Sequence, residues 1–150
     1  MNEPTSLASP RVMFVSFLCV VAAFVVCWLS WGVVALVLAA LFFPESFELL
    51  TRETLAGSQT AGQMNQVMPA ALYWSTSGIH VILCLAVGWG LIRLASPWRN
   101  QQVIFTAVLL FLTYLQAAVQ ASDGMRWMPM VQMSLQPIAV LAGAKWLGRF

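Results

Sequence analysis

Charged side chains are scarce in this sequence. Asp, Glu, Lys and Arg make up only 8% of the 150 residues, and hydrophobic residues make up 61%. Soluble domains carry about 25% charged and roughly 45–50% apolar residues. So few charges exclude a soluble globular domain and a disordered chain, because neither could stay solvated with this composition. The net charge of +2, without any cluster of Lys and Arg, also excludes a nucleic-acid partner.

Groups that perform acid–base or nucleophilic chemistry are equally few. The chain has 1 histidine and 5 acidic residues, and every acidic residue lies outside the long apolar runs. A single histidine and Asp123, which lies in a predicted loop, cannot build a Ser-His-Asp set, and a pair of buried carboxylates is missing. The 3 cysteines form no CxxC motif, which leaves a disulfide relay without its usual chemistry. The sequence predicts that the protein is not an enzyme.

Long apolar runs dominate what is present. A membrane-spanning helix needs about 20 consecutive apolar residues, and suitable runs occupy residues 12–43, 69–95, 103–121 and 127–147. We therefore predict a single integral membrane domain over the whole chain. Its fold class is an all-α membrane protein, with four transmembrane helices in an antiparallel bundle and a short amphipathic helix at 44–57 on the outer face.

The segment 44–57 differs from the apolar runs around it. Pro44, Glu45 and Glu48 are typical of the first turn of a helix, where acidic side chains oppose the positive end of the dipole. Gly57 suits a helix C-terminus. Apolar residues recur at helical spacing between these ends, which favours a helix lying on the membrane surface. Packing against a partner subunit is the alternative.

The orientation follows from the basic residues of the short connections, because cytoplasmic loops are rich in Lys and Arg. One side of the predicted bundle carries Arg11, Arg93, Arg99, Lys145 and Arg149. The other side has only Arg52 and Arg126. This asymmetry predicts that both termini are cytoplasmic. The compact chain with short loops favours a bacterial inner membrane.

Two pairs of glutamines lie in the third and fourth predicted spans, namely Gln116, Gln120, Gln132 and Gln136. Each pair has i, i+4 spacing and therefore shares one face of its helix. We expect the two faces to meet and to lock the hairpin, or a subunit contact, by amide hydrogen bonds. Ala139 and Gly143 form a small-xxx-small pair that suits close helix packing.

His80 is the only ionisable residue deep in a predicted span, and Cys84 follows it at i+4 on the same face. An intramembrane ionisable residue is a functional hypothesis by default. One interpretation makes His80 a neutral hydrogen-bonding group between helices. The other makes it a metal or haem ligand or a group that lines a polar cavity, with Cys27 and Cys84 as further ligands if the metal is soft.

Most of the 8 methionines are placed near the predicted outer surface. They are Met64, Met68, Met125, Met128, Met130 and Met133. Thioethers are soft ligands that suit Cu(I), so these residues are candidate copper ligands. In the type of ligand and in their position on the outer side of the membrane, they are similar to the Met motifs of copper-uptake proteins. The alternative is that they fill irregular gaps between helices.

These features favour a non-catalytic interaction or assembly subunit of a larger membrane or envelope complex, such as a secretion, transfer or respiratory assembly. Its expected partners are the lipid bilayer and other membrane subunits or further copies of itself. One alternative is the handling or transport of Cu(I) through the outer methionines. The other is a homo-oligomeric channel or exporter for small solutes, which the lack of buried carboxylates disfavours.

Overall fold

The structure is a computed structural model of residues 1–150 and describes residues 9–55, 69–94, 98–120 and 127–146. These residues form the helices α1 (Pro10–Phe42), α2 (Pro44–Leu55), α4 (Ala70–Arg93), α5 (Arg99–Gln120) and α6 (Trp127–Trp146). The predicted all-helical fold is confirmed for this part of the chain. Three of the described helices, α1, α4 and α5, are long and apolar enough to cross a membrane.

The fourth predicted span coincides with α6, but α6 is not among these three helices. Its 20 residues form one continuous helix but include Pro137 and the two polar amides of Gln132 and Gln136. All three of these side chains are buried against the protein. They lower the apolar character of the helix without placing an amide in lipid. A fourth crossing therefore stays a prediction.

Prolines and charges set the ends of the helices. Pro44 has no N–H and restricts the residue before it, so Phe43 leaves the helical conformation and α1 ends at Phe42. The chain resumes at once as α2, which confirms a helix in the segment predicted as amphipathic. The helix α5 begins at Arg99, ahead of the predicted apolar run, because a helix continues into the polar interface where a hydrophobic span does not.

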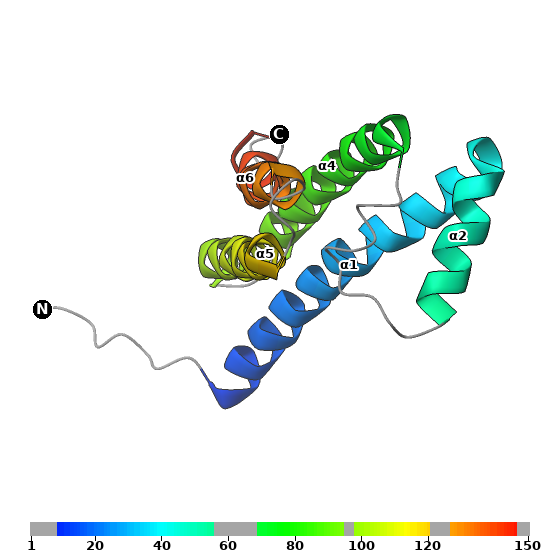
Figure 1. Ribbon diagram of the computed structural model, residues 1–150. Helices are drawn as coiled ribbons and strands as arrows, with labels where there is room; N and C mark the ends of the chain where they lie inside the picture. The colour runs from blue at the N-terminus through cyan, green and yellow to red at the C-terminus, as the bar shows by residue number, and fades with distance from the viewer. Residues whose placement is uncertain (1–8, 56–68, 95–97, 121–126, 147–150) are drawn as a thin grey trace, which may run out of the picture.

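The long helices alternate in direction (Figure 1). Ala35 and Ala39 of α1 pack on the start of α4, and Cys27, earlier in α1, contacts His80, which is later in α4, so these two helices are antiparallel. The helices α1 and α5 run in one direction, and α4 and α6 in the other. The most extensive packing joins α6 to α4 and to α5. The helix α2 packs only on α1 to any appreciable extent, so it lies at the edge of the bundle.

The basic residues gather at one end of this arrangement, where α1 and α5 begin and α4 and α6 end. The described residues there include Arg11, Arg93, Arg99 and Lys145. The acidic residues of the described ranges, Glu45, Glu48 and Glu53, belong to α2, which follows the opposite end of α1 and also contains Arg52. We call the basic end the cationic end. Charge is therefore separated along the axis of the bundle.

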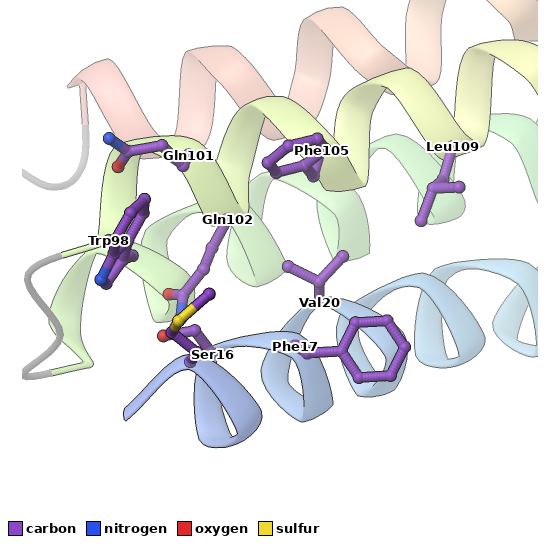
Figure 2. A pocket seen from close by; sticks show the side chains of 9 residues that line it. Ser16, Phe17, Val20, Trp98, Gln101, Gln102, Phe105 and Leu109 are labelled. Atoms are coloured by element: carbon purple, nitrogen blue, oxygen red, sulfur yellow. The ribbon is translucent and has the colours of Figure 1, made fainter. Parts of the chain in front are cut away.

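The helix α1 is the least covered of the three long apolar helices. Only 11% of its most apolar 18-residue window is buried, against 33% for α4 and α5. Near the cationic end a groove of about 430 Å³ lies between α1 and α5 (Figure 2). We call it the α1–α5 groove; its apolar walls include Phe17 and Phe105.

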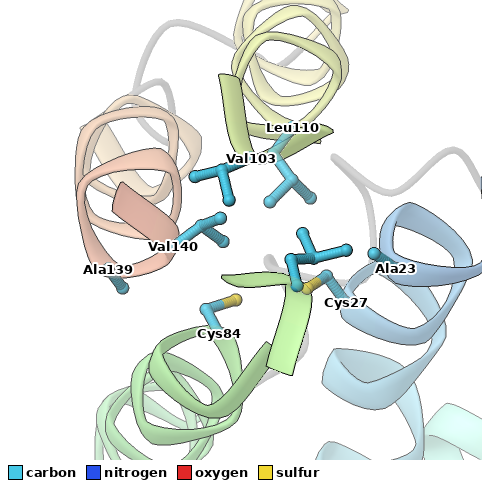
Figure 3. Packing of buried hydrophobic residues seen from close by; sticks show 8 residues of the cluster. Ala23, Cys27, Cys84, Val103, Leu110, Ala139 and Val140 are labelled. Carbon is cyan, nitrogen blue, oxygen red and sulfur yellow. The ribbon is translucent and has the colours of Figure 1, made fainter. Parts of the chain in front are cut away.

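The core forms where the four long helices meet (Figure 3). Its main cluster consists of Ala23, Cys27, Cys84, Leu91, Val103, Leu110, Ala139 and Val140. A second cluster joins Ala35 and Ala39 of α1 to Leu72 and Tyr73 of α4. Small side chains on α1 let α4 approach closely in both clusters. Dense packing of this kind stabilises membrane bundles, because burial away from water contributes little between helices already in lipid.

Candidate functional site

A hydrogen-bonded polar cluster occupies the interface of α4 and α6. The Nε2 atom of Gln132 donates to the hydroxyl of Tyr73 at 3.3 Å and to the hydroxyl of Ser77. Gln136 in turn donates from Nε2 to Oε1 of Gln132. All four side chains are buried. We call these residues the α4–α6 amide cluster, and it joins two helices that are distant in sequence.

The two pairs of glutamines do not face each other, contrary to the prediction from the sequence. Gln132 and Gln136 face α4, whereas Gln116 and Gln120 are exposed on α5. The inward face of α5 is the apolar ridge that contains Val103 and Leu110. That ridge lies opposite Gln116 around the helix. The i, i+4 spacing correctly places each pair on one face, but it does not specify which neighbour that face meets.

The helices α4 and α6 also approach each other through two glycines. A Cβ atom added at Gly143 would lie 2.0 Å from the carbonyl oxygen of Leu85, and one added at Gly88 would lie 2.0 Å from that of Val140. No side chain fits at either position. Ala139, one turn before Gly143, is buried as well. The predicted small-residue face of α6 therefore lies in a close helix contact, and its counterpart is Gly88.

Tyr73, Ser77 and Gly88 belong to this interface and were not predicted from the sequence. Tyr73 and Ser77 have the same i, i+4 spacing that marks the glutamines. A polar pair in one span opposite an amide pair in another is the signal that points to them. Gly88 lies beside Gly90, and spacing alone does not show which of the two faces a neighbouring helix.

His80 connects α4 to α1. Its Nε2 atom lies 2.6 Å from the backbone carbonyl oxygen of Cys27, and the imidazole is fully buried. A carbonyl only accepts hydrogen bonds, so Nε2 carries the proton and donates it. The sulfur of Cys84 lies 3.7 Å from the same nitrogen. This geometry uses His80 as a hydrogen-bonding group between helices, the first of the two interpretations above.

The metal hypothesis gains no support from the described residues. Among them, no group of three or more His, Cys, Asp or Glu side chains is arranged to hold an ion. Met64, Met68 and Met125 lie outside the described part, as does the side chain of Met128. Of the remaining candidates, Met130 is exposed and Met133 is half-buried. Copper binding by the methionines therefore stays a prediction.

A small hollow lies beside the α4–α6 amide cluster. It has a volume of about 70 Å³, and its lining includes Trp28, Trp31, Tyr114 and Gln132. A water molecule occupies about 30 Å³ in the liquid, so the hollow has room for roughly two waters. Its size suits hydration of buried polar groups and is far below the volume of about 300 Å³ or more that ligand sites usually have.

The chain matches no family model, and comparisons with curated proteins and with solved structures give no match either.

Proposed function

We propose that this protein is a non-catalytic interaction or assembly subunit of a larger complex in a membrane, with a bacterial inner membrane as its setting. The proposal includes a four-span bundle in which α6 is the fourth crossing. It also includes α2 as an amphipathic helix at the outer surface. The membrane setting itself rests on the three long apolar helices.

One observation carries the proposal. The helix α1 is 33 residues long, which corresponds to about 50 Å at roughly 1.5 Å per residue. A much shorter helix crosses a hydrocarbon core of about 30 Å, and the rest of the bundle covers little of α1. A long apolar helix with so much free surface suits contact with further helices. The described interior, by contrast, consists mainly of packed side chains and internal hydrogen bonds, and its hollow of about 70 Å³ is small.

Purification of the tagged full-length protein in mild detergent from its native membrane tests this function. We expect other membrane subunits to co-purify in fixed stoichiometry and to be identified by mass spectrometry. The same sample is analysed for copper. A metal-free protein that runs alone as a homo-oligomer would contradict the proposal and favour a channel or exporter. Near-stoichiometric copper that is lost when Met64, Met68, Met128 and Met130 are changed to Leu would favour Cu(I) handling.

The orientation has its own test. With both termini cytoplasmic, Ser58 faces outward and Asn100 faces the cytoplasm, according to the distribution of basic residues. We expect Ser58→Cys to react with an impermeant thiol reagent on whole cells and Asn100→Cys to react only after lysis. The unsubstituted protein, whose cysteines lie in α1 and α4, is the control. The reverse labelling pattern would invert the proposed topology.

A further inference from the structure

The α1–α5 groove has the shape of a binding site for hydrocarbon. Its lining consists of Met13, Ser16, Phe17 and Val20 from α1, and Trp98, Gln101, Gln102, Phe105 and Leu109 from α5. Val20 lies on its floor and is 8% exposed, whereas Phe17 and Phe105 form open walls and are about 60% exposed (Figure 2). The volume of about 430 Å³ is within the range of roughly 300–1,000 Å³ that ligand pockets occupy.

The groove extends from the polar interface into the apolar layer. Its lining on α5 runs from Trp98 to Leu109, which is about 16 Å along a helix that rises roughly 1.5 Å per residue. Trp98, Gln101 and Gln102 precede the predicted apolar run, which begins at Val103, whereas Phe105 and Leu109 lie within it. The groove therefore combines a polar mouth with an apolar interior, as a phospholipid combines a headgroup with acyl chains.

The mouth of the groove favours a negative headgroup. It lies at the cationic end, where the described part of the chain has basic residues and no carboxylate. Arg99 follows Trp98 directly and is exposed at the first position of α5, where the helix dipole is positive. Trp98 is of the residue type that concentrates at the level of lipid headgroups. Phosphate oxygens complement the charge of Arg99, which lies next to the lining in sequence, and the lining itself contributes the amides of Gln101 and Gln102.

From this combination of polar mouth, apolar walls and charge we infer that the α1–α5 groove binds one anionic phospholipid. The acyl chain passes Trp98 and lies between Phe17 and Phe105, and the phosphate lies at the mouth of the groove beside Arg99. The inference does not depend on the proposed subunit function, because a lipid at this site requires no protein partner.

Quenching of tryptophan fluorescence tests the site. The full-length protein is reconstituted into vesicles of phosphatidylcholine with a minor share of phosphatidylglycerol. Two preparations are compared: in one the phosphatidylcholine carries brominated acyl chains, and in the other the phosphatidylglycerol does. Bromine quenches a tryptophan on contact. The protein has 7 tryptophans, so the signal of Trp98 is taken as the difference between the unsubstituted protein and Trp98→Phe. We expect phosphatidylglycerol to quench this signal about fivefold more than its bulk share predicts, the enrichment that one basic residue near the membrane surface provides.

Two tryptophans make a matched pair for this experiment. Trp98 lines the groove, whereas Trp146 is exposed at the end of α6 and lies at the same end of the bundle. The excess quenching should disappear in Trp98→Phe and persist in Trp146→Phe. Quenching that follows the bulk share in every variant would overturn the inference. A Trp98 that neither lipid quenches would also overturn it, because a protein helix would then cover the groove.

Groove filling and charge removal provide independent variants. Val20→Phe fills the floor of the groove and should abolish the excess quenching by phosphatidylglycerol. Val33→Phe, at an exposed position of α1 outside the groove, should preserve this excess quenching. Arg99→Gln should reduce the excess about fivefold. Lys145→Gln removes the same charge from the same end on α6 and should leave the excess unchanged. Equal effects of the two charge variants would contradict a specific site at Arg99.

Discussion

Replacing Gly143 by alanine is expected to destabilise the bundle by about 1–3 kcal/mol, the usual cost of overpacking a filled core. The added Cβ would lie 2.0 Å from the carbonyl oxygen of Leu85 and 2.8 Å from its Cα. These are backbone atoms, so no rotamer change relieves the clash and the two helices must separate. Separation weakens the most extensive packing in the structure. Unfolding of the detergent-solubilised protein in increasing SDS, followed by circular dichroism, measures the effect.

Gly90 and Gly78 provide the controls, because a Cβ atom at either position meets no heavy atom within 4 Å. Alanine at these positions of α4 should change the stability by no more than about 0.5 kcal/mol. Gly88→Ala should resemble Gly143→Ala, since it clashes with Val140 in the same helix contact. The double variant should cost less than the sum, because the first substitution already separates the helices. Equal effects of Gly143→Ala and Gly90→Ala would contradict this account.

Gln132→Leu is expected to destabilise the protein by about 1–2 kcal/mol. The substitution removes the donor to Tyr73 and Ser77 and the acceptor of Gln136 at once. Buried polar groups left without partners cost about 1–3 kcal/mol. Hydrogen bonds between membrane helices contribute roughly 0.6 kcal/mol on average and up to about 1.7, which limits the effect. The same SDS titration measures it.

Gln116→Leu is the matched control, because it makes the same chemical change at an exposed position of α5. We expect no loss of stability, since leucine suits a lipid-facing surface. Gln132→Leu and Ser77→Ala should be non-additive, because each breaks the same hydrogen bond. Gln132→Leu and Gln116→Leu should be additive. Strong coupling between Gln116 and Gln132 would instead support the hairpin lock that the sequence predicts.

The sequence alone determined the helical membrane class and the positions of the helices. A run of about 20 apolar residues has few folded alternatives in lipid, because every backbone polar group must be bonded within its own segment. The predicted segment 69–95 accordingly became Ala70–Arg93, and Pro44 ended α1 at Phe42 as its missing N–H requires. The segment 44–57 contained the expected helix for similarly local reasons.

Which helix faces meet depends on how the helices pack together. Spacing placed Gln132 and Gln136 on one face of α6, but the choice between α5 and α4 as the partner depends on the rotation of each helix within the bundle. The contact of Gly88 with α6 and the packing of Gly143 against Leu85 fix that rotation. They turn the amides of α6 towards Tyr73 and Ser77, and the ridge of Leu110 keeps Gln116 outside. Helix periodicity is a property of one segment, whereas rotation and closest approach are set jointly by all the helices that pack together.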